Sequence, residues 1–368
     1  MRRTREELVR LADARADWVT FAVAATEVLR RGVGFDSSCW HTVDPGTVLF
    51  TGNLHQDVAC SGSWLAEHEY VLDDVNKWSF LARSGRRAGA TSLATHGDLQ
   101  RSARHRSQAS YGLGDELRAS FVVDGAYWGA VGLLRGADRR WFTEDDVSYL
   151  ASVTEVIARA FRRALVVGHA EAPTSDHGPG VVIFDADGAV ELVSPAAERW
   201  IAEIVELPAP THPGESKAVR ATAARARTMA ADDGPATAGS RVRTRSGAWL
   251  VLYGTPLAGG DGGRTAVIMQ PATPNEVAPL VALAYGLSVR ERRVAELSLQ
   301  GRSTKEMSRA LGVSPHTVQD HLKSIFEKTG VRSRGELVGQ VFLEHYVPRW
   351  ETLETPDASW AGLGLPPS

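Results

Sequence analysis

Cysteine is scarce in this sequence, with Cys39 and Cys60 as the two thiols among 368 residues. Two cysteines are too few for a disulfide framework, and they do not form the C-x-x-C pair that is typical of zinc scaffolds. The sequence therefore argues against a disulfide-stapled fold and against a structural zinc site. We expect folded domains with hydrophobic cores, without a bound metal or cofactor.

Long apolar runs are also missing. The longest near-apolar stretch, residues 121–134, contains Asp124 and several glycines, so it falls short of the ~18 uninterrupted residues that a membrane span needs. The amino terminus carries Arg2, Arg3 and Arg5 and lacks the apolar core and cleavage site of a secretory signal. We therefore expect a cytoplasmic protein without a transmembrane helix.

Motifs of catalysis are a third absence. No H-E-x-x-H, G-x-S-x-G, DFG-like or paired-cysteine pattern occurs in a fitting context. The glycine-rich run 259–263 is not followed by a helix start with Lys and Ser or Thr, which favours a hairpin loop over a phosphate site. We expect the protein not to be an enzyme.

Charge is nearly balanced over the whole chain but not along it. Residues 285–347 hold seven Arg and three Lys against six Glu and one Asp, a net charge of +3. Because the total is −3, the rest of the chain carries −6. A small basic module attached to acidic domains indicates contact with nucleic acid through one end of the chain.

The pattern over residues 1–167 predicts an α+β domain. Apolar residues spaced three and four apart over 4–31 indicate one long opening helix. Two turn-linked pairs of strand-like segments follow, at 38–51 and 117–134. A closing helix begins after the expected N-cap Thr143 and continues to about Val167.

Residues 168–180 are rich in Pro, Gly and small polar residues, which predicts a linker. A second, smaller α+β domain is expected over 181–271, followed by another linker at 272–284. The C-terminal domain then spans 285–347 and leaves a tail at 348–368. The second domain is expected to contain strands at 181–184, 190–193, 241–244, 249–253 and 265–269, with a helix from Ser194-Pro195 to about Val205.

Helix starts and stops are unusually clear between Leu287 and Tyr346. Ser-x-x-Glu capping boxes and one Ser-Pro pair mark the starts of four short helices, and glycines mark the stops. The starts are Ser288, Ser303, Ser314 and Ser333, and the stops are Gly301, Gly312 and Gly330. Because only Gly312-Val313 separates the second and third helices, the pattern predicts a helix-turn-helix in an all-α domain.

The third of these helices, residues 314–329, has the division of faces that a recognition helix needs. Its apolar residues Val318, Leu322, Ile325 and Phe326 share one face. Hydrogen-bonding side chains occupy the other face, where they could reach base edges in a major groove. A merely solvated polar face is the alternative, which the basic segment and the helix punctuation disfavour.

The run LSVRERRVAELSLQGRSTKEMSRALGVSPHTVQDHLKSIFEKTGVRSRGEL, residues 287–337, resembles the DNA-binding domain of LuxR-type transcription factors over its whole length. The matching residues include Arg290-Glu291, Gly301, Lys305-Glu306, Val313-Ser314 and Thr317-Val318. This resemblance covers about a sixth of the chain. It implies double-stranded DNA as a partner.

The resemblance also implies which residues touch DNA. Its base-reading positions fall on Gln319, Asp320 and Lys323. Its backbone-contacting positions fall on Ser303, Lys305, Thr317, His321 and Arg334. Gln319 and Asp320 depart from the basic residues often found there; Gln can pair with adenine, and a carboxylate can accept from cytosine N4.

The N-terminal regions resemble sensor domains of actinobacterial regulators. The segments CWHTVDPGT, WGAVGLLR and FTEDD look like parts of a GAF domain, and residues 181–271 look PAS-like. No receiver pattern with clustered aspartates follows a first strand, which argues against control by phosphorylation.

Aromatic residues of the first domain suggest where an organic effector could bind. An apolar pocket lined by Trp40, Trp64, Tyr70, Trp78 and Trp128 is one hypothesis, and ordinary core packing is the other. Cys39 and His41 share a strand face, which would suit haem, a metal or a redox switch as well as a structural role. The arginine-rich run 83–106 would suit either an anionic ligand or a solvated loop.

Together these patterns predict a one-component transcription regulator whose sensor domains respond to a small organic effector or mediate assembly. The alternative is a scaffold protein with only nonspecific DNA binding. The family usually binds DNA as a dimer through its last helix, which implies a homodimer contact at Leu337, Val341 and Phe342. RNA polymerase would be a further partner of an activator.

Overall fold

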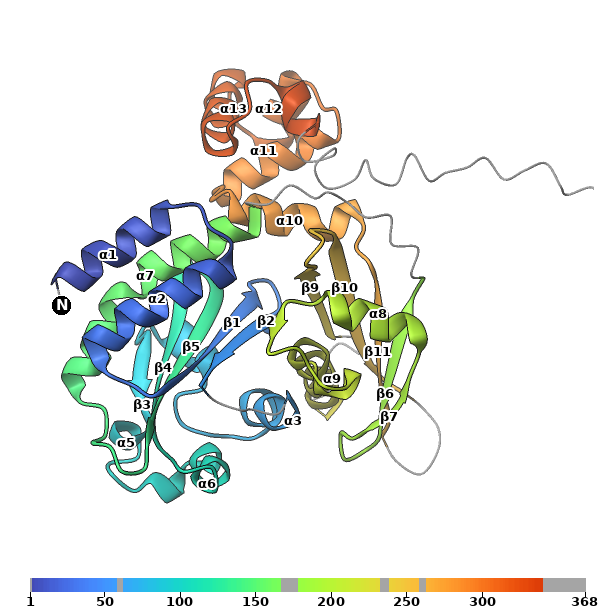
Figure 1. The fold of residues 1–368 in the computed structure, drawn as a ribbon. Helices are drawn as coiled ribbons and strands as arrows, with labels where there is room; N and C mark the ends of the chain where they lie inside the picture. Colours follow the sequence, from blue (N-terminus) through green and yellow to red (C-terminus); the bar gives the residue numbers. More distant parts are fainter. Residues whose placement is uncertain (1, 58–61, 167–177, 232–237, 258–262, 340–368) are drawn as a thin grey trace, which may run out of the picture. The chain divides into compact units, whose positions relative to one another are not determined.

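The computed structural model describes residues 2–57, 62–166, 178–231, 238–257 and 263–339. These residues form two compact units (Figure 1). The N-terminal unit ends at Ser288, and the C-terminal unit begins at Val289. Within the N-terminal unit we call residues 2–166 the first lobe and residues 178–271 the second lobe.

The first lobe is built on an antiparallel sheet with helices on both faces. Its strands lie in the order β3-β4-β5-β1-β2, and β8 of the second lobe is added beside β2. The strands are β1 (Ser37–Asp44), β2 (Leu49–Gln56), β3 (Ala88–Ala90), β4 (Leu113–Val123) and β5 (Ala126–Gly136). Both hairpins expected from the sequence, β1 with β2 and β4 with β5, are confirmed.

Helices α2 (Trp18–Val33) and α7 (Glu144–Val166) cover one face of this sheet, and α1 (Arg2–Asp13) packs against both of these helices (Figure 1). The prediction of a single opening helix over 4–31 is wrong. Asp17 ends that continuity because its carboxylate accepts hydrogen bonds from the backbone N–H groups of Val19 and Thr20, which caps a second helix.

Shorter helical segments cover the opposite face of the first sheet. They are α3 (Gly62–Ala66), a π-helical turn (Glu67–Val71), α4 (Trp78–Ser84), α5 (Thr91–Ala94), a 3₁₀ turn (Leu99–Arg101) and α6 (Ala103–Ala109). Side chains alternate between the two faces along each strand, so Trp40 enters the core under α2 and α7 while Cys39 enters the core on the other face.

The second lobe contains a five-stranded antiparallel sheet with strand order β7-β6-β11-β10-β9. Its five strands, all expected from the sequence, are β6 (Gly180–Phe184), β7 (Val190–Val193), β9 (Ala238–Arg243), β10 (Trp249–Pro256) and β11 (Thr265–Pro271). Between them lie α8 (Pro195–Glu203), β8 (Glu206–Leu207), a 3₁₀ turn (Pro213–Glu215) and α9 (Lys217–Ala231). The Ser194 hydroxyl caps α8, as expected.

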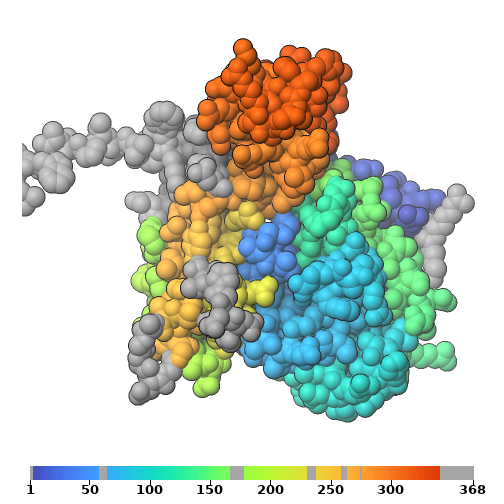
Figure 2. Space-filling view, turned by 180° about the vertical axis from the view of Figure 1, so that it is seen from behind, coloured from blue at the N-terminus to red at the C-terminus, as the bar shows by residue number. Residues whose placement is uncertain are grey.

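The two lobes are joined by a shared sheet and by shared hydrophobic clusters. Strand β8 pairs in parallel with β2, and Asn53 and Glu206 are register partners. In Figure 2 the blue-to-green first lobe and the second lobe, coloured from lime through yellow to orange, meet in one continuous surface. The described part of the first predicted linker begins only at residue 178, so most of that linker lies outside the described residues.

The second predicted linker, 272–284, is helical. It forms α10 (Pro274–Ala284), which begins with a capping box between Thr273 and Glu276. Val277, Leu280 and Val281 are buried in the same core as α2 and α7. This segment therefore belongs to the folded N-terminal unit, because its apolar face is covered.

The C-terminal unit consists of α11 (Val289–Leu299), α12 (Thr304–Leu311), α13 (Pro315–Thr329) and a final helical segment at 334–339. Gly301, Gly312 and Gly330 all have positive φ at the expected helix ends. Ser303 and Glu306 form the complete capping box. At the final helix, the Ser333 hydroxyl accepts from the backbone N–H of Glu336, as expected for an N-cap. The Glu336 carboxylate, however, accepts from the backbone N–H of Arg332, whereas a capping box would use the N–H of Ser333.

In the part of the chain that the structure describes, no helix is long and apolar enough to cross a membrane.

Candidate functional site

Helix α13 divides its side chains as the sequence predicts. Val318, Leu322 and Ile325 are buried, and Phe326 is half-buried beside them. Gln319, Asp320 and Lys323, the residues that the resemblance assigns to base readout, are all exposed. The helix is therefore held by a small core on one side and presents polar side chains on the other.

Asp320 has a neighbour on the same helix. Its Oδ2 lies 3.0 Å from Nδ1 of His316, one turn earlier, and both side chains are largely exposed. This contact orients the carboxylate along the helix surface. Among the described residues, none donates a hydrogen bond to the other Asp320 carboxylate oxygen, so that oxygen can accept from a base edge.

Most of the predicted phosphate-contacting residues surround the start of α12 and of α13. Ser303 caps α12, and Lys305 is exposed in its first turn. The hydroxyls of Ser314 and Thr317 lie 2.9 Å apart at the start of α13. His321 is half-buried one turn later. Helix starts present unpaired N–H groups and favour anions, so this placement suits phosphate oxygens.

Arg334 also has a structural role, since its guanidinium donates to the backbone carbonyl of Arg302. This bond ties the segment after α13 to the turn between α11 and α12. Replacing Arg334 would therefore disturb the fold of the C-terminal unit as well as any phosphate contact.

Glu291 is a residue whose role the sequence did not reveal. The capping-box pattern predicts it at the start of α11. Its buried carboxylate also accepts from Ser324 Oγ at 2.6 Å and from Lys328 Nζ at 2.7 Å. These contacts join α11 to α13 across 33 and 37 positions of sequence. No local pattern could have identified partners so distant.

The predicted dimer contact is only partly described. Leu337 is buried within the single chain, so its side chain belongs to the core of the C-terminal unit. Val341 and Phe342 lie outside the described residues. The dimer contact at the last helix stays a prediction.

Comparison with known proteins agrees with this geometry. The family model described as "Bacterial regulatory proteins, luxR family" matches residues 286–340. The spore germination protein GerE of Bacillus subtilis is 40% identical over 52 residues, which make up 14% of this chain and 70% of GerE. The chain belongs to the LuxR family.

Other LuxR-family relatives match over the same short region. The transcriptional regulatory protein UhpA of Escherichia coli is 45% identical over 56 residues, 15% of this chain and 29% of UhpA. A putative HTH-type transcriptional regulator of Aeromonas salmonicida is 44% identical over 61 residues, 17% of this chain and 31% of the relative. The match thus spans about a third of the length of such relatives.

Solved structures overlap with this LuxR-family chain only weakly. A phage VqmA in complex with DPO aligns at 18% identity over 53% of this chain and 94% of that chain, with a TM-score of 0.25. The bacteriophytochrome RpBphP3 of R. palustris aligns at 11% identity over 74% of this chain and 62% of that chain, with a TM-score of 0.31. Scores this low establish no shared fold.

The five aromatic residues predicted to line an effector pocket lie on two faces of the first sheet. Trp40 and Trp128 are buried in the core under α2 and α7, where the Trp40 indole donates to Thr26 Oγ1 at 2.9 Å. Trp78, Tyr70 and Trp64 lie on the other face. The structure therefore does not bring the five residues into one cavity.

A buried charge network lies behind Trp78. The Arg118 guanidinium stacks 3.7 Å from the Trp78 ring centre and pairs with Glu69 at 3.1 Å and with Glu116 at 2.9 Å. Glu116 also pairs with Arg104, a fully buried member of the arginine-rich run 83–106. Burial alone would raise the pKa of Glu116, but the two guanidiniums lower it.

Arg104 shows that the run 83–106 is not simply a solvated basic loop. Its guanidinium contacts carboxylates of Asp74 and Glu116, which the sequence does not place near it. Such a network is satisfied by chain segments that meet only in the folded lobe.

Cys39 and His41 are both buried on β1 and share a face of the sheet, as predicted. The His41 ring stacks on Phe50, with ring centres 4.5 Å apart. Burial, then the neighbouring His55, Arg118 and Lys217, lower the pKa of His41 well below its usual value. Among the described residues, no group of three or more His, Cys, Asp or Glu side chains could hold a metal ion.

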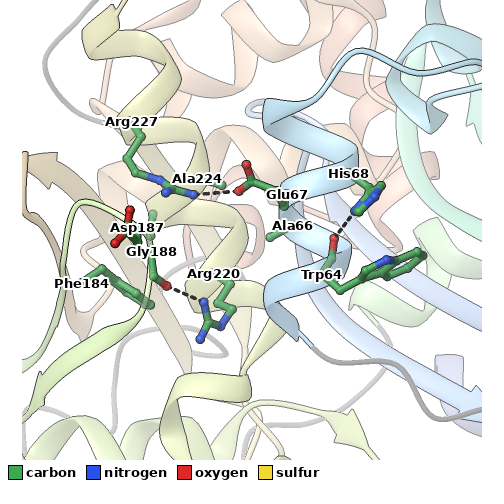
Figure 3. A pocket seen from close by; sticks show the side chains of 11 residues that line it. Trp64, Ala66, Glu67, His68, Phe184, Asp187, Gly188, Arg220, Ala224 and Arg227 are labelled. Carbon is green, nitrogen blue, oxygen red and sulfur yellow. Dashed lines mark hydrogen bonds and ion pairs between the residues drawn. The ribbon is translucent and has the colours of Figure 1, made fainter. Parts of the chain in front are cut away.

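A cavity of about 270 Å³ lies where the two lobes of the N-terminal unit meet (Figure 3). Of the five predicted aromatic residues, Trp64 lines it. Its other walls come from the π-helical turn of the first lobe and from β6 and α9 of the second lobe.

Proposed function

We propose that this LuxR-family chain is a one-component, cytoplasmic transcription regulator whose C-terminal helix-turn-helix reads DNA in the major groove. The observation that carries the proposal is the exposed row Gln319, Asp320 and Lys323 on a helix whose opposite face is buried. A helix built in this way can enter the groove without losing its own core.

The three side chains differ in what they can recognise. Gln319 can form two hydrogen bonds with adenine N6 and N7, Asp320 can accept from cytosine N4, and Lys323 can donate to guanine O6 and N7. Each good base contact discriminates against a wrong base pair by about 1–3 kcal/mol. The site therefore predicts a sequence-selective interface.

Exposed cations around this row would supply general affinity. Lys305 lies in the first turn of α12, and the net charge of residues 285–347 is +3. Phosphate contacts of this kind release counterions, so they contribute to binding on any sequence and weaken as salt rises.

The N-terminal unit supplies control in this proposal. Its lobes, which resemble GAF and PAS sensors, bind a small organic effector or mediate assembly without catalysing a reaction. The helix α10, buried against the first lobe and continuous in sequence with α11, would carry the change to the DNA-binding helices. Control requires that the effector bind the DNA-competent and incompetent states unequally.

Assembly is part of the same proposal. A homodimer would bind an inverted repeat whose half-site centres are about one helical turn, ~10 base pairs, or a multiple of it apart. RNA polymerase is a further partner if the protein activates transcription. Light scattering at micromolar concentration tests the dimer, and a monomer on a single asymmetric half-site would contradict it.

Genome-wide binding followed by footprinting of the full chain tests the DNA-binding function. We expect protection of a defined sequence at moderate salt and weaker, unlocalised protection of random DNA. Equal protection of both would instead favour a scaffold protein with nonspecific DNA contact.

A further inference from the structure

We propose that the cavity between the two lobes binds a small aromatic carboxylate, with Arg220 as the group that receives the carboxylate. The site is separate from the helix-turn-helix. Its regulatory consequence rests on the function proposed above, whereas the binding itself can be tested without DNA.

The cavity has the size and surface of a small-ligand site. Its volume of about 270 Å³ is slightly below the usual range for ligand pockets, which begins at about 300 Å³, so it limits the ligand to a small molecule. Trp64 and Phe184 are aromatic members of its lining, and Ala223 and Ala224 of α9 add apolar wall. The Arg220 guanidinium lies 5.5 Å from the Phe184 ring centre. Trp64 is held by a stacking contact with His68, with ring centres 4.7 Å apart. A lining that combines aromatic and small apolar residues suits a planar ring.

The guanidiniums of Arg220 and Arg227 both line this cavity, and they differ in whether a carboxylate pairs with them. Arg227 Nη2 lies 3.0 Å from Glu67 Oε2 across the cavity, so that charge is neutralised by the first lobe (Figure 3). Arg220 forms no ion pair with a carboxylate of the described residues. It donates instead to two backbone carbonyls, those of Gly214 and of Gly188, the latter at 2.7 Å.

The two carbonyls fix the Arg220 side chain without neutralising it. Partial burial, then the charge of Arg227, lower the pKa of Arg220, and the carboxylates of Glu215 and Asp185 offset this only in part, so its positive charge is disfavoured where it stands. An anion beside Arg220 would relieve this cost. A guanidinium is also the side chain best suited to bind a carboxylate through two parallel hydrogen bonds.

The turn that completes the cavity depends on a glycine. Gly188 has φ +80°, and a Cβ there would lie 2.8 Å from Arg227 Nη1. The absence of a side chain lets the guanidinium lie against the turn while the Gly188 carbonyl holds Arg220. The exposed Asp187 beside it disfavours a ligand with a second negative charge at this end. The geometry therefore points to a monocarboxylate.

The ligand would touch both lobes at once. Trp64 and Glu67 belong to the first lobe, and Phe184 and Arg220 belong to the second. A bound acid would thus change the stability of the contact between lobes, and through it the unit that ends in α10. The acid changes the affinity for DNA only if it binds the DNA-competent and the incompetent state of the protein with different affinities.

Isothermal titration of the full chain tests the site with benzoate, phenylacetate and 1-naphthoate. Phenylacetamide serves as the uncharged control and acetate as the control without a ring. We expect at least one aromatic acid to bind at least tenfold more tightly than either control. Binding of none of the three acids, or equal binding of phenylacetate and its amide, would overturn the proposal.

Three variants locate the binding. Arg220→Gln should weaken the acid at least tenfold, and Trp64→Leu should weaken it several-fold. Arg225→Gln removes a charge from the same helix at a position that does not line the cavity, and it should change affinity less than twofold. If Arg220→Gln fails to fold, Trp64→Leu and the acid-against-amide comparison still decide. Unchanged affinity in both folded variants would contradict the site.

Operator binding with and without the acid separates this site from the proposed function. Tight binding of the acid with unchanged operator affinity supports the site and contradicts only its regulatory role. Failure of the acid to bind a chain that still protects its operator overturns the site and leaves the DNA-binding function intact.

Discussion

Asp44 and Arg241, 197 positions apart in the sequence, form a two-point ion pair between the lobes. Arg241 Nη2 and Nε lie 2.6 and 2.8 Å from the two carboxylate oxygens, and the Arg241 backbone N–H donates to the same carboxylate at 2.9 Å. Arg241 Nη1 also donates to the carbonyl of Glu276 in α10. One side chain therefore joins β1, β9 and α10.

Replacing Asp44 by Ala should destabilise the N-terminal unit by about 3 kcal/mol, because it leaves the mostly buried Arg241 guanidinium without its counter-charge. Urea unfolding followed by tryptophan fluorescence measures this. Glu155→Ala, which removes an exposed pair with Arg159, should cost no more than about 0.5 kcal/mol. A similar decrease in the free energy of unfolding for both variants would show that the Asp44–Arg241 pair stabilises the fold no more than an exposed ion pair does.

Replacing Glu291 by Gln should loosen the packing of α11 on α13, at a cost of about 2 kcal/mol, since the side chain loses the negative charge that pairs with Lys328 and one of its two acceptor oxygens. Hydrogen exchange of the α13 amides in the full chain reports this locally. Glu296→Gln affects an exposed pair on the same helix and should leave exchange nearly unchanged. Equal protection in Glu291→Gln and the parent would disprove the assigned role.

Replacing Gln319 by Ala should weaken binding to the cognate site by about 1–3 kcal/mol and leave random DNA almost unaffected. Lys305→Ala should weaken both and lower the slope of log affinity against log salt by about one. Fluorescence anisotropy over a salt series distinguishes the two kinds of contact. A uniform loss for Gln319→Ala would remove it from the base-reading set.

Acid should destabilise the fold through His55. Burial, then the charge of Lys217, lower the pKa of His55 to about 3, against the usual value of 6.5. Between these values the unfolded chain binds a proton that the folded chain does not, so the free energy of unfolding falls as the pH drops below 6.5. The raised pKa of Glu206 acts in the opposite direction, so the parent profile alone is ambiguous.

The His55→Asn variant isolates this contribution. Below pH 6.5 its free energy of unfolding should fall less steeply with decreasing pH than that of the parent. The difference between the two slopes should be about 1.4 kcal/mol per pH unit. Above pH 7.5, where histidine is neutral in both states, the difference between the two proteins should be constant. Parallel profiles from pH 4 to pH 7.5 would show that His55 does not carry the effect.

The C-terminal helices were predictable because their signals are local. A capping serine contacts a backbone N–H three residues on, as Ser303 does with Glu306, and a glycine end needs only its own φ, as at Gly312. The exposed row Gln319, Asp320 and Lys323 follows from the helical repeat alone. The hairpins β1–β2 and β4–β5 were also accessible, since each is closed by a short turn.

Other features depended on contacts that sequence spacing does not encode. The break at Asp17 was missed because apolar periodicity continues through it, although the side-chain cap is visible once the backbone is known. The burial of α10 and the pairing of β8 with β2 depend on a first lobe more than a hundred residues earlier. The secondary-structure propensity of a segment predicts whether it forms a helix or a strand. It does not predict which part of the fold will cover that helix or strand.

The sequence by itself determined the family of this chain, the helix ends of its C-terminal unit, the two hairpins of the first lobe and the exposed polar row on α13. Only the tertiary structure decided that Asp44 meets Arg241, that Glu291 joins α11 to α13 and that Arg220 lines a cavity between the lobes without an ion pair to any described carboxylate. The physical reason is that hydrogen-bonded helices and turns are fixed by neighbours in the chain, whereas burial and charge pairing are fixed by neighbours in space.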